Sequence, residues 1–165
     1  MLSLQSQPYA LAPGEGPVFW TLGLPGWAKA TGEQTGGAFS LVEALCPSGY
    51  ATPLHIHYTE DEAIYVLEGV LTIFCGAETV TAMSGSYVYQ PRGIAHGFLT
   101  EGESPARFLC LTVPAGRDQG SPELGEAESG LALPPAVVLE LETLANLAAK
   151  YKIEVLGPLP NPEAE

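Results

Sequence analysis

Three histidines and one glutamate are the residues of this chain whose types and spacing could bind a transition metal. His55 and His57 are separated by one residue, and Glu62 follows five residues later. Residues i and i+2 of a β-strand project from the same face, so both imidazoles would enter one space. Two histidines and a carboxylate, with coordination positions left open, suit a non-haem transition metal. The chain has only 3 histidines, which disfavours a chance pairing of two of them on a surface strand.

The remaining histidine, His96, closes a second stretch that begins at Gly85. Pro91 and Gly93 punctuate this stretch, as is typical of a strand that leads into a tight turn. All histidines of the chain therefore fall inside two glycine-framed strand motifs.

The two motifs carry a specific resemblance. The first reads G-x5-H-x-H-x4-E-x6-G from Gly49 to Gly69, and the second reads G-x5-P-x-G-x2-H from Gly85 to His96. Together they resemble the two signature motifs of the cupin superfamily, with one departure at Thr100, where the second motif usually ends in Asn. The resemblance implies that one divalent metal ion per chain is bound by four residues: His55, His57, Glu62 and His96.

This ligand set leaves the identity of the metal open. Three imidazoles and a carboxylate, with no soft ligand, admit Fe, Ni, Mn, Co, Cu or Zn. Because only neutral imidazole binds a metal, the ion should be lost as the pH falls through the histidine range. Glu62 is also the candidate catalytic residue, since its carboxylate could act as a general base if substrate displaces it from the metal.

Two further segments, Thr35–Glu43 and Leu144–Pro160, resemble those of bacterial monocupins described as quercetin 2,3-dioxygenase-like. That resemblance implies a dioxygenase that cleaves a flavonol or a similar enolic aromatic substrate with O2 and releases carbon monoxide. One scaffold hosts many chemistries, so two alternatives stay open. The first is a metal-dependent isomerase or lyase on a small oxo-acid or sugar-like compound, with the metal as Lewis acid and Arg92 as a possible holder of a carboxylate. The second is a non-catalytic metal-binding or metabolite-binding cupin.

Short strands must position these residues. The 165 residues include 19 glycines and 15 prolines, a composition typical of many strands joined by turns. Eight or more apolar runs at regular spacing predict an all-β fold, a jelly-roll β-barrel, over residues 17–114, and the resemblance implies that this barrel is of the cupin type. Four residues could wall an aromatic-sized cavity in it, although plain core packing is more common for any one of them: Phe39, Ile64, Ile73 and Phe108.

The segments around the barrel have different patterns. Residues 1–16 are predicted to form an N-terminal arm, and residues 115–133 a surface loop, either ordered as a lid or disordered. Helical spacing of apolar residues from Pro135 to Lys152 predicts a C-terminal amphipathic helix. Residues 134–165 would thus form a helix and a tail packed on the barrel, the tail ending in proline-rich acidic coil.

Composition excludes several classes of partner. The formal net charge of −13 argues against nucleic acids and anionic membrane surfaces. No apolar run approaches the roughly 20 residues of a membrane-spanning helix, and the first 16 residues lack the features of a signal peptide. Cys46, Cys75 and Cys110 form no C-x-x-C pair, which favours reduced, buried thiols in a cytoplasmic protein. We therefore predict a small-molecule substrate, and the family resemblance implies a homodimer.

Overall fold

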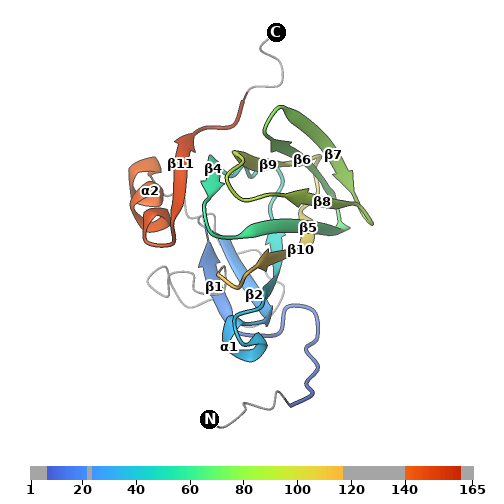
Figure 1. Cartoon of the computed structure of the whole chain (residues 1–165). Helices are drawn as coiled ribbons and strands as arrows, with labels where there is room; N and C mark the ends of the chain where they lie inside the picture. Colours follow the sequence, from blue (N-terminus) through green and yellow to red (C-terminus); the bar gives the residue numbers. More distant parts are fainter. Residues whose placement is uncertain (1–6, 22–23, 117–139, 161–165) are drawn as a thin grey trace.

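The computed structural model describes residues 7–21, 24–116 and 140–160, whose strands form two antiparallel sheets (Figure 1). The elements follow in the order β1 (Val18–Thr21), β2 (Leu24–Ala30), α1 (Gly32–Thr35), β3 (Ser40–Cys46), β4 (Leu54–His57), β5 (Asp61–Glu68), β6 (Val70–Cys75), β7 (Glu78–Met83), β8 (Tyr87–Gln90), β9 (His96–Glu101), β10 (Ala106–Val113), α2 (Leu141–Ala149) and β11 (Ile153–Gly157).

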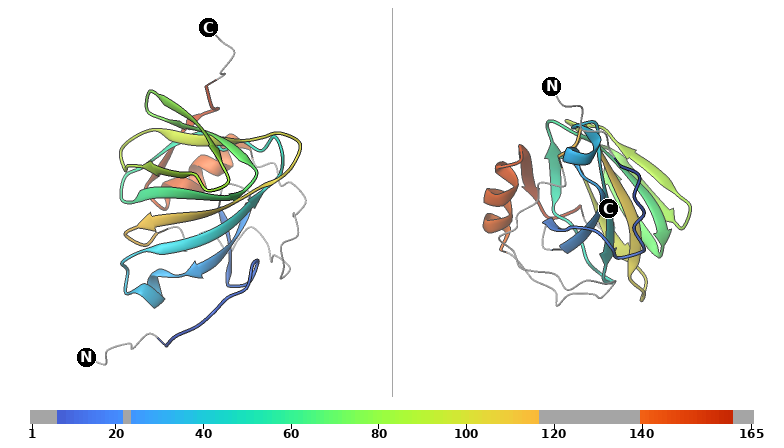
Figure 2. Two further views of the ribbon diagram at one scale, coloured as in Figure 1. Left: turned by 90° about the vertical axis from the view of Figure 1, so that its right-hand side faces the viewer. Right: turned by 90° about the horizontal axis from the view of Figure 1, so that it is seen from below.

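The two sheets divide the strands between them in an order that does not follow the sequence. The six-stranded sheet has the order β1-β2-β3-β10-β5-β8, and the five-stranded sheet has the order β11-β4-β9-β6-β7. Figure 2 shows the same two layers from two further directions. The predicted all-β jelly-roll architecture with a C-terminal helix is confirmed. Every strand pair named here is antiparallel, so neighbouring strands bring residues from distant parts of the chain into register.

The core lies between the sheets, and every second side chain of a strand such as β10 is buried in it. Along β10, Ala106, Phe108, Cys110 and Thr112 are buried, whereas the intervening side chains are less so. The rings of Phe98 and Phe108 meet edge to face, with centroids 5.2 Å apart. Of the four residues proposed as cavity walls, Phe39 is exposed and the other three pack in this core with no exposed surface: Ile64, Ile73 and Phe108.

A buried carboxylate anchors the N-terminal arm to the six-stranded sheet. Glu43 projects from the outer face of β3, is 2% exposed and pairs with Lys29 Nζ at 2.8 Å and with Arg107 Nη1 at 2.9 Å. The backbone N–H of Gly14 donates to the same carboxylate at 2.9 Å. Lys29 also donates to the carbonyl of Ala12 at 2.7 Å, so that one charge cluster connects the arm to three strands, β2, β3 and β10.

The C-terminal segment ends in a strand that the sequence did not predict. Helix α2 is shorter than the predicted helix, whose first residues, 135–139, lie outside the described residues. Parts of the other predicted segments also lie outside them: residues 1–6, 117–133 and 161–165. After α2 the chain turns and forms β11, which pairs with β4 so that Val155 lies opposite His55 and Ile153 opposite His57. Alternation of Ile153 and Val155 with Glu154 suits a strand, and β4 offers it an edge. In the part of the chain that the structure describes, no helix is long and apolar enough to cross a membrane.

Candidate metal centre

Two neighbouring strands bring the three histidines together. His55 and His57 project from β4, and His96 begins β9, where it is the register partner of His55. All three are buried, with at most 3% of their surface exposed. One ring nitrogen of each lies within 4.8 Å of those of the other two. The structure therefore positions three histidines to bind a metal ion, as the spacing of His55 and His57 predicted.

Backbone contacts orient two of the rings. Nδ1 of His55 lies 2.8 Å from the carbonyl oxygen of Pro53, and Nδ1 of His96 lies 2.8 Å from that of Ile94. A proton on Nδ1 would be donated to these carbonyls, which leaves Nε2 as the metal ligand in both rings. Nε2 of His55 is buried and has no hydrogen-bond partner among the described residues. The donor set therefore fits a divalent transition metal.

Electrostatics keep His55 in the form that a metal requires. Burial, together with the neighbouring His96 and His57, lowers the pKa of His55 to about 3, against an opposing effect of Glu62. A neutral imidazole is the form that binds a metal. His55 consequently needs to lose no proton at neutral pH before an ion enters.

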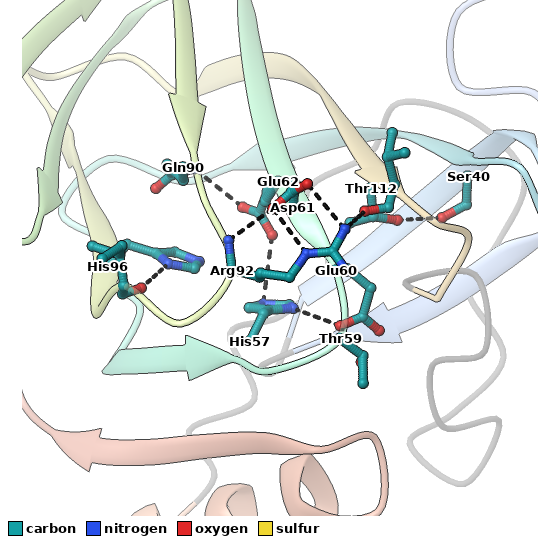
Figure 3. Close-up of polar contacts among 12 residues, drawn as sticks. Ser40, His57, Thr59, Glu60, Asp61, Glu62, Gln90, Arg92, His96 and Thr112 are labelled. Carbon is teal, nitrogen blue, oxygen red and sulfur yellow. Dashed lines mark hydrogen bonds and ion pairs between the residues drawn. The ribbon is translucent and has the colours of Figure 1, made fainter.

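Glu62 lies beside the histidines, on the opposing sheet. It projects inward from β5, is 3% exposed and places Oε2 at 3.6 Å from Nε2 of His57. Nε2 of Gln90 donates to the other oxygen, Oε1, at 3.4 Å. Figure 3 shows Glu62 between Gln90 and His57. Its carboxylate is not among the ligand atoms that lie within 4.8 Å of one another, so its place as fourth ligand stays a prediction.

The wall around Glu62 is polar rather than aromatic. A row of inward residues crosses four adjacent strands in register, and we call it the polar row: Ser40, Thr112, Glu62 and Gln90. All four are buried, and the hydroxyls of Ser40 and Thr112 are 2.5 Å apart. Sequence reasoning missed Gln90, although Val88 and Gln90 share one face of β8 and a glutamine at an inward position is a signal for a buried polar contact.

Glu60 is a second residue that sequence reasoning missed. It is 7% exposed, and its Oε2 lies 3.6 Å from Nδ1 of His57. Burial by itself raises the pKa of Glu60, but the contacts with His57 and Thr59 outweigh this effect and the pKa is lowered. Its carboxylate is therefore held ionised next to the metal-facing histidine, and only its position three residues after His57 hinted at this contact.

Arg92, considered above as a holder of a substrate carboxylate, is engaged elsewhere. Its Nη2 and Nε atoms lie 3.0 and 3.1 Å from the two oxygens of Asp61, and Nη2 also donates to the carbonyl of Val113 at 3.1 Å. The hydrogen bonds from Arg92 lower the pKa of Asp61 to about 2. The guanidinium thus binds the strand that carries Glu62 and has Asp61 as its carboxylate partner.

The segment that contains these residues is similar to known proteins. The cupin domain model matches residues 41–112. An uncharacterized protein of Methanocaldococcus jannaschii is 36% identical over 75 residues, which cover 46% of this chain and 60% of that protein. Quercetin 2,3-dioxygenase of Bacillus subtilis is 33% identical over 97 residues, which cover 59% of this chain and 29% of that enzyme. The chain thus spans less than two thirds of the length of either relative.

Solved structures show a similar fold. A predicted oxalate decarboxylase from Thermotoga maritima superposes with a TM-score of 0.58 at 18% identity, covering 64% of this chain and 99% of that one. An RmlC-like cupin from Shewanella frigidimarina gives a TM-score of 0.56 at 16% identity, covering 70% and 99%. At these identities the likeness concerns the fold alone. The matched domain, the shared fold and the similarity to the Bacillus enzyme lead to one conclusion: residues 41–112 match the cupin domain, and the chain resembles cupin proteins, among them quercetin 2,3-dioxygenase.

Proposed function

We propose that this protein is a metal-dependent, quercetinase-like dioxygenase that cleaves a flavonol or a similar enolic aromatic substrate with O2. The observation that carries the proposal is the group of three buried histidines beside an equally buried carboxylate. The similarity to quercetin 2,3-dioxygenase of Bacillus subtilis supports this choice among cupin activities.

The proposed metal site consists of four residues on three strands: His55, His57, His96 and Glu62. A divalent transition metal bound there would supply a Lewis acid for an enolic oxygen and a place for O2 to react. The three rings face it from the five-stranded sheet, and the carboxylate faces it from the six-stranded sheet.

Glu62 is the proposed general base. Gln90 holds Oε1, so Oε2 is the oxygen that lies toward His57, and we assign Oε2 to the substrate. In this geometry Oε2 takes the proton of the enolic hydroxyl. Because Glu62 is 3% exposed, the proton acceptor is shielded from bulk water, and the transferred proton stays in the site.

The test is Glu62→Gln, which keeps the shape of the side chain and removes its basicity. We expect the variant to retain much of its metal on the three histidines and to lose roughly 100-fold or more in kcat, the scale of a lost general base. The matched control is Asp61→Asn, an adjacent carboxylate that contacts Arg92, which should keep metal content and kcat near those of the wild type.

Metal content and aerobic quercetin turnover are measured on the same samples, loaded with Fe, Ni, Mn, Co or Cu. Full activity of metal-loaded Glu62→Gln would remove Glu62 from the mechanism, and loss of metal in proportion to activity would leave it a ligand only. Absence of turnover with every metal would exclude flavonol cleavage.

The polar row favours one alternative function. Hydroxyl and amide groups next to Glu62 would suit a small, oxygen-rich substrate, as expected of a metal-dependent isomerase or lyase. Turnover that persists without O2 would separate this activity from the dioxygenase. The homodimer and the cytoplasmic location stay predictions, to be checked by sedimentation and by fractionation.

A further inference from the structure

We infer that Glu60 is a positioning residue of the metal centre, whose carboxylate accepts the Nδ1 proton of His57 and so directs Nε2 of His57 toward the ion. The inference rests on the metal site proposed above and adds a residue outside the cupin motif ligands. It concerns the ring of His57, which, among the described residues, has no backbone contact like those that orient the other two rings.

His57 differs from its two neighbours in what faces its Nδ1 atom. His55 and His96 each have a carbonyl oxygen at 2.8 Å from Nδ1. Nδ1 of His57 is buried with no hydrogen-bond partner in the described part of the chain, and Oε2 of Glu60 lies 3.6 Å away. A shift of about 0.6 Å would bring this pair into the usual hydrogen-bond range of roughly 3.0 Å.

The same ring has a carboxylate on each side. Nε2 of His57 lies 3.6 Å from Oε2 of Glu62, and Nδ1 lies 3.6 Å from Oε2 of Glu60. Figure 3 marks both contacts with dashed lines. The proton of a neutral imidazole can therefore lie toward either carboxylate. Only the form with the proton on Nδ1, toward Glu60, leaves Nε2 available to a metal.

The surroundings of Glu60 hold its carboxylate in place. Thr59 Oγ1 donates to Oε2 at 2.7 Å, and the side chain is otherwise buried. Gly116 supplies the space for the other oxygen, since a Cβ atom at that position would stand 2.2 Å from Oε1. A buried carboxylate is costly unless donors compensate it, and Nδ1–H of His57 is a donor that lies nearby.

The consequence is that His57 is a stronger ligand than its neighbours. A carboxylate partner on one ring nitrogen raises the basicity of the other and fixes the ring, and losing such a partner typically costs about 10- to 100-fold in metal affinity. Removing Glu60 should therefore weaken metal binding by that factor although all three histidines remain.

The experiment compares Glu60→Ala, Glu60→Gln and Gly116→Ala with the wild-type full chain. Nitrogen NMR of the metal-free protein at pH 7 reports which nitrogen of His57 carries the proton, and Co2+ titration against a competing chelator gives the dissociation constant. We expect the wild type to protonate Nδ1, and Glu60→Ala to move the proton toward Nε2 and to weaken Co2+ binding about 10- to 100-fold. Glu60→Gln, which keeps a neutral acceptor, should fall between them.

Gly116→Ala keeps the carboxylate and crowds it, so a shift in the same direction would show that the position of Glu60 matters. Asp61→Asn is the control, and it should leave the protonated nitrogen and the Co2+ constant unchanged. An unchanged tautomer together with a Co2+ constant within twofold of wild type in Glu60→Ala would overturn the inference. If the wild type bound no Co2+, the proposed metal site would fail, whereas the NMR result would still decide the role of Glu60.

Discussion

Glu43→Gln tests how much the buried charge cluster under the N-terminal arm contributes to stability. The substitution keeps the shape of the side chain and removes its charge. Lys29 and Arg107, whose side chains are 15% and 19% exposed, would then face each other without the carboxylate that separates them. The hydrogen bond from Gly14 can be kept by the amide oxygen of Gln.

The buried ion pairs of Glu43 set the expected loss in the free energy of unfolding. Removing one partner of a buried ion pair typically costs about 3–5 kcal/mol. Since Gln retains one acceptor and both cations can turn partly toward water, we expect a loss of about 3 kcal/mol in the free energy of unfolding. For a domain of this size that corresponds to a decrease in Tm of about 6–12 °C.

The matched control is Glu68→Gln, which removes the other carboxylate bound to Arg107. Glu68 lies 2.6 Å from Arg107 Nη2, but its side chain is 64% exposed, so the loss should be about 0–1 kcal/mol. Equal losses in the two variants would refute the argument from burial.

The pH dependence gives a second check on Glu43. Burial raises its pKa, but hydrogen bonds from Lys29, Gly14 and Arg107 outweigh this effect and the pKa is lowered from 4.5. A carboxyl group with a lowered pKa contributes stability that is complete above its unfolded value and is lost as the pH falls through the folded value. Urea unfolding at pH 7 and in steps below pH 4.5 should thus show the gap between wild type and Glu43→Gln narrowing with acid. A gap that stays constant would contradict the assigned charge state.

Two further predictions concern the barrel interior. His96→Ala should reduce metal content sharply while the protein stays folded, because the apolar core is a cluster separate from the histidines. Metal content is measured by elemental analysis. Stoichiometric metal in the double variant His55→Ala/His96→Ala would refute the assignment of the ligands. Thr100→Asn should leave metal content and activity near wild type, because Thr100 lies four positions after His96 along β9, about 13 Å away. Since Thr100 is 1% exposed, the larger side chain should lower stability by about 1–3 kcal/mol, and a changed metal content would show that Thr100 shapes the site.

The part of the metal centre that could be predicted from sequence is the part set by local geometry. Side chains two residues apart in a β-strand share one face, so His55 and His57 could be predicted to lie together before any strand pairing was known. The contacts of Gln90 and Glu60 could not be predicted, because they depend on strand register and on a turn. Gln90 reaches Glu62 only because β8 pairs with β5 in one register, and a shift by one residue would point its side chain to the outer face. Glu60 is buried because Gly116, which follows β10, leaves space beside it.

The pairing of β11 with β4 has a consequence for the order in which the protein is made. A nascent chain that has left the ribosome as far as Val113 already contains all three histidines, yet one edge of β4 still lacks its neighbour. An unpaired edge strand is free to pair with other chains. Metal that enters early would hold β4 against β9 through His55 and His96, while β11 has still to be synthesised. An ion bound at this stage would join β4 to β9 until β11 is made and pairs with the other edge of β4.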